Sequence, residues 1–155
     1  MAVEVGQEAP DFELSDHTGE KVRLSSFRGE KNVVLVFFPK AFTGICTGEL
    51  CEIRDLGTVF ENDDTVVLGV SCDTSATLKV FAETEGYQFQ LLSDFWPHGA
   101  VAQLYGVFLE AAGIATRATF IIDKDGVVRW SVVNGPGDAR RTAEYREALA
   151  ALQPA

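Results

Sequence analysis

The sequence predicts a single α/β domain, and three observations support this prediction. The chain has 155 residues, a length that fits one domain and lets it bury a substantial core. Two apolar runs, residues 33–38 and 66–71, lack the alternation of a half-exposed strand and are typical of strands covered on both faces. Between them, residues 44–62 have apolar side chains at helical spacing, so the order strand, helix, strand predicts a parallel crossover unit.

The elements in the first half of the chain can be justified in order. Residues 11–24 predict a small N-terminal hairpin around the turn sequence HTGE. The helix after the first apolar strand is indicated by five apolar positions: Ile45, Leu50, Ile53, Leu56 and Phe60. Residues 75–86 predict a second helix that ends at Gly86, because glycine commonly terminates helices.

The second half of the chain continues the α/β pattern. Residues 118–133 predict two strands separated by DKDG, a hairpin turn signal. Residues 138–153 predict a closing helix with Asp138 as its N-cap. The sequence contains no repeat, no low-complexity tract and no linker, so we expect residues 1–155 to form one domain.

The charge composition excludes several function classes. Thirteen basic and 23 acidic residues give a formal net charge of −10, which argues against a nucleic-acid partner because such binding depends on Lys and Arg. The N-terminus carries acidic residues early and lacks an apolar signal region, and no apolar run approaches the length of a membrane span. We therefore expect a cytoplasmic protein without membrane association, acting on neutral or small substrates.

The cysteine and histidine content predicts neither a disulfide scaffold nor a metal site. Three cysteines are too few for a secreted disulfide framework. His17 lies in a predicted turn and His98 follows a proline, and neither has a second ligand at metal-binding spacing. We expect both histidines to be structural, and we expect the protein to use no metal and no cofactor.

The stretch FFPKAFTGICTGEL places a cysteine where thiols become reactive. Pro39 ends the first apolar strand, and Cys46 falls near the first turn of the following helix, where unpaired backbone N–H groups favour a thiolate. A thiol of ordinary pKa, about 8.5, is about 3% ionised at pH 7, and lowering that pKa to about 6 requires about 3.4 kcal/mol. A helix terminus supplies at most about 2 kcal/mol, so a reactive cysteine here needs a cation as well.

Arg117 is the best candidate for that cation. Lys40 is close in sequence, but the guanidinium of Arg117 offers a fixed fork of donors, and a charge-assisted hydrogen bond contributes about 1.5 to 3 kcal/mol. Thr43, three residues before Cys46, can direct its hydroxyl to the same space. The sequence thus predicts a small pocket of donors around one thiolate.

These residues resemble the active-site motif of the peroxiredoxins. The motif is Pro39-x3-Thr43-x2-Cys46 with a downstream arginine at Arg117. The resemblance extends over nearly the whole chain, through APDF, LLSD and TFIID. Within the family, FFPKAFTGICTGEL and LLSDFWPHGAVAQLYGVF resemble the alkyl hydroperoxide reductase E group.

The resemblance implies a fold, an activity and residue roles. The fold would be thioredoxin-like, with a central mixed sheet flanked by helices and an added N-terminal hairpin. The activity would be thiol-dependent reduction of hydrogen peroxide and alkyl hydroperoxides, with peroxynitrite as a further substrate. Cys46 would attack the peroxide and become a sulfenic acid. Pro39 would shield the sulfur, Thr43 and Arg117 would bind the peroxide oxygens, and Glu49 would orient Arg117.

A second cysteine, Cys51, follows Cys46 by five residues. On an ideal helix this spacing separates the Cα atoms by about 8.6 Å, whereas a disulfide needs about 4.4 to 6.8 Å, so the two can bridge only after the helix unwinds. The spacing is similar to that of the bacterioferritin-comigratory peroxiredoxins, whereas the E group usually has one cysteine and relies on an external thiol. Our hypothesis is that Cys51 resolves oxidised Cys46. Packing of Cys51 in the helix face, and resolution by Cys72 at the end of the second apolar strand, remain alternatives.

The same resemblance implies partners. A thiol reductant is required, with thioredoxin, mycoredoxin and a low-molecular-weight thiol as candidates, and a homodimer is expected through loops near the active site, including DFWPHG. A redox sensor or holdase that uses the same cysteine oxidation is the alternative function. A general disulfide oxidoreductase is disfavoured, because the chain has no CxxC motif and TRAT supplies no proline before the strand that begins near Ala118.

Overall fold

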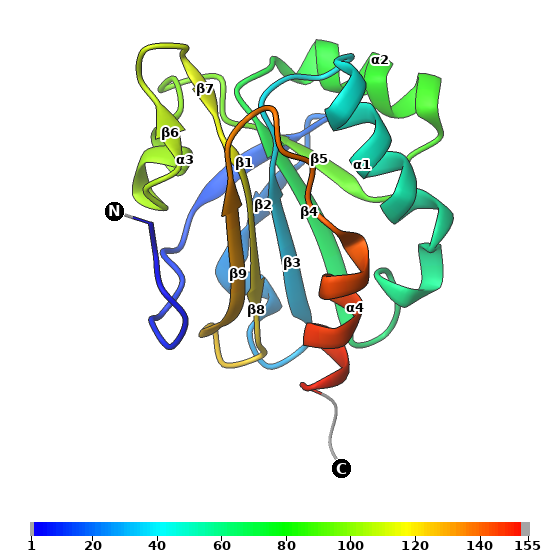
Figure 1. The fold of residues 1–155 in the computed structure, drawn as a ribbon, viewed down its shortest axis with the longest axis vertical. Helices are drawn as coiled ribbons and strands as arrows, with labels where there is room; N and C mark the ends of the chain where they lie inside the picture. Colours follow the sequence, from blue (N-terminus) through cyan, green and yellow to red (C-terminus); the bar gives the residue numbers. More distant parts are fainter. Residues whose placement is uncertain (1, 153–155) are drawn as a thin grey trace.

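A seven-stranded mixed sheet forms the centre of the protein in the computed structural model, which describes residues 2–152 (Figure 1). The strand order is β2-β1-β5-β4-β3-β8-β9. The bounds are β1 Glu13–Asp16, β2 Lys21–Arg23, β3 Asn32–Phe37, β4 Thr65–Ser71, β5 Gln90–Ser93, β8 Arg117–Ile122 and β9 Val128–Asn134. The β3–β4 and β4–β5 pairs are parallel, and the remaining pairs are antiparallel. The predicted mixed sheet and N-terminal hairpin are confirmed.

Helices cover both faces of the sheet. They are α1 Gly44–Asp55, α2 Ser75–Glu85, α3 Ala100–Leu104 and α4 Thr142–Ala150, with 3-10 turns at Leu24–Phe27 and Gly57–Val59. Buried side chains of α1, α2 and α4 form one core cluster with one sheet face, and α3 and the N-terminal hairpin contribute to the cluster on the other face. Figure 1 shows α3 and the small hairpin of β6 (Phe108–Leu109) and β7 (Ile114–Ala115) apart from the other helices.

The crossover β3–α1–β4 and the neighbouring strand β8 position the residues of the predicted site. All residues of β3 and β4 are buried, as expected for strands covered on both faces. Strand β8 lies antiparallel beside β3, and Phe37 pairs with Ala118. Arg117, the first residue of β8, is therefore brought to the end of β3 from which the chain enters α1.

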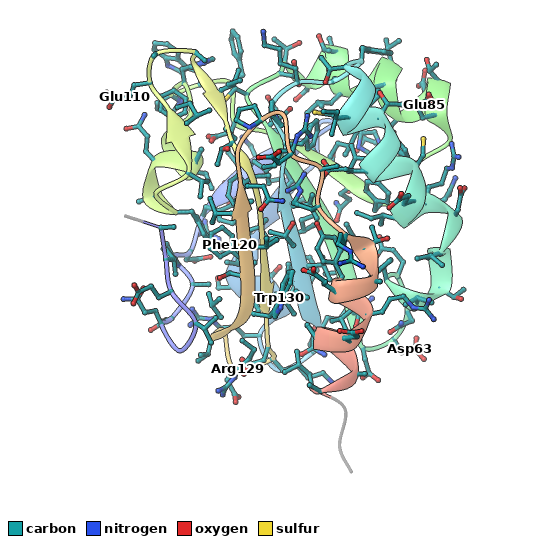
Figure 2. All side chains as sticks on the ribbon, in the orientation of Figure 1. Asp63, Glu85, Glu110, Phe120, Arg129 and Trp130 are labelled. Carbon is teal, nitrogen blue, oxygen red and sulfur yellow. The ribbon has the colours of Figure 1, made fainter. Side chains whose placement is uncertain are left out.

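The aromatic residues of the last two strands show how the layers are filled. Phe120 of β8 is fully buried and contacts Phe37 and Tyr105. Trp130 of β9 packs against Tyr145 of α4 with ring centroids 5.6 Å apart. Figure 2 shows both aromatic side chains within the body of the protein, whereas exposed charged side chains such as Glu110 and Arg129 project outward.

Two local predictions about helix bounds are wrong. The helix predicted across residues 44–62 ends at Asp55, and Leu56 and Phe60 lie beyond it because the chain passes through a 3-10 turn at Gly57. The N-cap of α4 is Arg141, not Asp138, and Asp138 instead lies in a turn in which its N–H donates to the carbonyl of Gly135. That turn serves the site described below, and the predicted end of the helix at residue 153 lies outside the described residues.

The described part of the chain, residues 2–152, contains no helix that is both long and apolar enough to cross a membrane.

Candidate active site

The site begins in the loop that connects β3 to α1. Pro39 is buried two residues after the end of β3, and Thr43 is the N-cap residue of α1. Cys46 lies in the first turn of α1 and has no exposed surface. The predicted placement of the cysteine at a helix N-terminus is therefore confirmed.

Arg117 contacts the thiol of Cys46 directly. Its Nη1 atom donates to Cys46 Sγ at 3.2 Å, and the same nitrogen donates to Glu49 Oε1 at 2.8 Å. Its Nε atom donates to the carbonyl oxygen of Pro136 at 2.6 Å. Arg117 is 3% exposed, so these charge-assisted bonds form away from bulk water.

Glu49 connects this arginine to a second one, Arg140. Arg140 Nη2 donates to Glu49 Oε1 at 2.8 Å, while the backbone N–H and Nε of Arg140 donate to Oε2 at 2.6 and 3.0 Å. Burial acts to raise the pKa of Glu49, but the hydrogen bonds and charge of Arg140 and the charge of Arg117 outweigh it and lower that pKa. Glu49 is thus held as a carboxylate between two guanidinium groups.

Arg140 is a residue of this site that the sequence did not predict. Its Nη1 atom donates to the carbonyl oxygens of Phe37 at 2.6 Å and Ala118 at 2.9 Å, so it joins the ends of β3 and β8. It follows the turn at residues 135–138 and precedes α4. Two adjacent arginines before a helix resemble a solvent-exposed helix start, and no sequence signal separates Arg140 from Arg141.

Buried charges of both signs lie beside Cys46. Arg117 and Arg140 supply two positive charges, and Glu49 supplies one negative charge; all three side chains are at most 6% exposed. Buried charges are costly unless they are paired. The two guanidinium groups and one carboxylate leave a net charge of +1 beside the Cys46 sulfur.

Thr43 and Phe42 occupy the exposed side of the loop. The hydroxyl of Thr43 donates to the carbonyl oxygen of Lys40 at 2.8 Å, so its oxygen can also accept a hydrogen bond. Phe42 is 52% exposed, and its ring centroid lies 4.9 Å from that of Phe81 in α2. The exposed side of this loop therefore combines the hydroxyl of Thr43 with the apolar surface of Phe42.

Cys51 lies on the same unbroken helix as Cys46 and is half-buried. Its Sγ atom is 3.6 Å from the hydroxyl oxygen of Tyr87, which also donates to the carbonyl oxygen of Thr47 at 3.4 Å. Both cysteines are free thiols. Because they lie five residues apart on one helix, Cys46 and Cys51 can form a disulfide only if the helix unwinds.

Cys72 lies at the end of β4 but belongs to the other side of the sheet. Cys72 lies near Ala115, which packs in the cluster that contains α3, whereas Cys46 packs with α1, α2 and α4. Burial raises the pKa of Cys72 to about 11, and the nearby carboxylates of Asp94 and Asp73 act in the same direction. The structure thus does not bring Cys72 to the Cys46 site.

The remaining predicted features have structural partners. His17 Nδ1 accepts from the backbone N–H of Leu91 at 3.2 Å, and the ring nitrogens of His98 bond the carbonyl oxygens of Phe95 and Gly113. Within residues 2–152, no group of three His, Cys, Asp or Glu side chains could hold a metal ion. Trp96, in the segment DFWPHG, is 79% exposed.

Comparison with known proteins decides the family. The profile of the AhpC/TSA family matches residues 5–131. The chain belongs to this family. Alkyl hydroperoxide reductase E of Mycobacterium tuberculosis is 53% identical over 148 residues, which cover 96% of this chain and 97% of that protein. Peroxiredoxin Bcp of Bacillus subtilis is 40% identical over 133 residues, which cover 81% of this chain and 82% of that protein.

A solved structure agrees with the sequence relatives. The crystal structure of peroxidoxin BcpB from Mycobacterium tuberculosis matches with a TM-score of 0.88 at 32% identity and covers 98% of this chain and 99% of that one. The predicted thioredoxin-like fold is therefore confirmed, and the protein is an enzyme of the peroxiredoxin type that reduces peroxides at the expense of thiols.

Proposed function

We propose that Cys46 is the peroxidatic cysteine, the residue that attacks the peroxide. Four residues assist this reaction by binding the peroxide, shielding the sulfur or orienting another residue: Arg117, Thr43, Glu49 and Pro39. The observation that carries this proposal is the 3.2 Å hydrogen bond from Arg117 Nη1 to Cys46 Sγ inside a buried cluster of two arginines and one glutamate. No other cysteine of this chain has a guanidinium bonded to its sulfur within the described residues 2–152.

The chemical step follows from this arrangement. The Cys46 thiolate attacks one peroxide oxygen, the S–O bond forms, and the O–O bond breaks. The sulfur is oxidised to a sulfenic acid, and the leaving oxygen takes a proton and departs as water or an alcohol. Arg117 donates to the leaving oxygen and stabilises the negative charge that develops on it, while the Thr43 oxygen, whose hydrogen is donated to Lys40, accepts a hydrogen bond from the O–H of the bound peroxide. Pro39 keeps water from the sulfur, and Glu49 holds the Arg117 fork in place.

Hydrogen peroxide and alkyl hydroperoxides are the proposed substrates. The exposed side chains of Phe42 and Ile45 lie on either side of Thr43 in the sequence and offer an apolar surface to an alkyl group. Peroxynitrite is a third proposed substrate, and the net charge of −10 gives this anion no long-range attraction. We therefore expect the rate with peroxynitrite, relative to the rate with neutral hydroperoxides, to fall as the salt concentration is lowered.

Recycling is proposed to run through Cys51. After unwinding of the first turns of α1, the Cys51 thiol attacks the Cys46 sulfenic acid, a disulfide forms, and water leaves. Thioredoxin, mycoredoxin or a low-molecular-weight thiol then reduces the disulfide. We also propose a cytoplasmic homodimer, and the 79% exposure of Trp96 supports a subunit contact through this segment.

The test is stopped-flow reaction of the reduced protein with less than one equivalent of peroxide, followed by thiol counting and peptide mapping. The wild type is compared with Cys46→Ser and Cys51→Ser. We expect Cys46→Ser to lose the fast reaction, the wild type to consume two thiols per peroxide, and Cys51→Ser to stop at the Cys46 sulfenic acid. Equal thiol loss in wild type and Cys51→Ser would contradict the role of Cys51.

Turnover with each of the three reductants completes this test. Steady consumption of peroxide with one of them identifies the physiological class of reductant. An oxidised protein that none of them recycles would instead support the sensor or holdase function.

A further inference from the structure

The loop that carries the site is tied to a residue outside it. The backbone N–H of Ala41 donates to Asp73 Oδ2 at 2.8 Å, across 32 positions of sequence. Ala41 lies between Pro39 and Thr43, and Asp73 lies just after β4. This bond joins the loop before α1 to the end of the neighbouring strand.

Asp73 is itself held in place on three sides. The hydroxyl of Ser71 donates to Asp73 Oδ2 at 2.7 Å, and the backbone N–H of Asp73 donates to the same hydroxyl at 3.3 Å. The hydroxyl of Ser93 donates to the Asp73 carbonyl oxygen at 2.6 Å. These bonds fix the orientation of the Asp73 carboxylate independently of its bond to Ala41. A residue that positions a loop needs to be fixed in this way.

The residue after Ala41 shows what this bond holds. Phe42 has a φ of 63°, a left-handed conformation that is unfavourable for a bulky L-residue. Such a residue persists only where its surroundings determine the backbone. Here the Asp73–Ala41 bond fixes the chain before Phe42, and the Thr43–Lys40 bond closes the loop around it.

We propose that Asp73 is a positioning residue for the peroxidase reaction: it holds the strained loop in the conformation that keeps Cys46 under Arg117 and opposes unwinding of α1. The inference rests on the proposed role of Cys46. When the bond is lost, Phe42 can relax to an ordinary backbone conformation, and the first turn of α1 loses its fixed start.

The consequence is a pair of effects with opposite signs. Attack on the peroxide requires the folded loop, so it becomes slower without Asp73. Any step that requires the first turns of α1 to open becomes faster. A general loss of structure would slow the first step without confining the increased opening to α1.

The experiment compares Asp73→Ala with Asp73→Asn. The amide oxygen of asparagine can accept the same two hydrogen bonds from Ala41 and Ser71, so this variant serves as the matched control. We expect Asp73→Ala to lower the peroxide rate constant by about tenfold to a hundredfold, and Asp73→Asn to restore it to within about threefold of wild type. Hydrogen exchange of the amides in α1 should rise in Asp73→Ala, with exchange in β8 unchanged.

Three outcomes would overturn the inference: a wild-type peroxide rate in Asp73→Ala, an asparagine variant as slow as the alanine variant, or increased exchange spread evenly over α1 and β8. Cys46→Ser is measured alongside. If it keeps the fast reaction, the proposed function fails and the inference falls with it; if it is inactive while Asp73→Ala reacts normally, only the inference fails. Should Asp73→Ala not fold, Ser71→Ala removes the hydroxyl that orients Asp73, and the same pattern is expected at about threefold.

Discussion

Cys46 and Cys72 are both buried near the ends of neighbouring strands, yet their surroundings carry opposite charge. Cys46 Sγ accepts a hydrogen bond from the guanidinium of Arg117, whereas Cys72 lies near the carboxylates of Asp94 and Asp73. Burial alone raises a thiol pKa, as it does for Cys72. The comparison shows that two cysteines of similar burial can differ in the charges buried with the sulfur, so burial alone does not distinguish them.

Removing the Arg117 guanidinium from Cys46 should make Cys46 slow to react with peroxide, as we expect Cys72 to be. We expect Arg117→Met to lower the second-order rate constant for peroxide by about a thousandfold, because it loses both the thiolate contact and the stabilisation of the leaving oxygen. Stopped-flow fluorescence of the tryptophans measures this rate. Arg117→Lys serves as the control and should recover part of the rate, since a lysine keeps the charge but lacks the fork. A normal rate in Arg117→Met would remove Arg117 from the mechanism.

Alkylation should report the other half of the comparison. With a pKa of about 11, Cys72 at pH 8 has about a thousandth of its thiol ionised, compared with about a quarter for an ordinary cysteine. We expect iodoacetamide to modify Cys72 in the folded protein about 200-fold more slowly than in urea. Peptide mapping of a Cys46→Ser variant isolates this site from the reactive one. Equal labelling of Cys72 in both conditions would show that its surroundings do not suppress the thiolate.

Glu49 should matter for stability as well as for rate. Glu49→Gln removes the negative charge shared by two buried guanidinium groups, and breaking a buried ion pair costs about 3 to 5 kcal/mol. Urea unfolding at pH 7 measures this loss. Because the pKa of Glu49 is lowered, its contribution is present above about pH 4.5 and lost as the pH falls below it. The difference between wild type and Glu49→Gln should therefore narrow in acid, and a constant difference would contradict the assignment.

The sequence predicted the parts of this site that local pattern determines. Cys46 and Thr43 follow a buried strand and begin a helix, and Arg117, 71 positions after Cys46, is expected beside it because a thiolate needs a cation and because the three residues match the peroxiredoxin motif. Arg140 and Asp73 could not be predicted, because neither belongs to that motif and no chemical requirement visible in the sequence points to them: Arg140 contacts Glu49 across 91 positions and Asp73 contacts Ala41 across 32. Such pairings depend on sheet order and on the turn after β9.

Two glutamates repeat the contrast between the cysteines on a smaller scale. Glu49 is buried between guanidinium groups and its pKa is lowered, whereas Glu61 lines a cavity of about 240 Å³ with Ile53 and Phe89, and burial raises the pKa of Glu61 to about 7. The N–H of Val67, 3.3 Å from Glu61 Oε2, only partly offsets this burial.

Glu61 should therefore make the protein less stable as the pH rises. Between about pH 4.5 and 7 the folded chain holds a proton that the unfolded chain has released, so the free energy of unfolding falls across this window. After allowance for its partial exposure to solvent, we expect Glu61→Gln to stabilise the protein by about 1 kcal/mol at pH 8 and to have little effect at pH 4. Urea unfolding at both pH values tests this prediction, with the exposed Glu110→Gln as the matched control. A gain at pH 4 equal to that at pH 8 would mean that the amide improves packing and that the buried charge has no part in it.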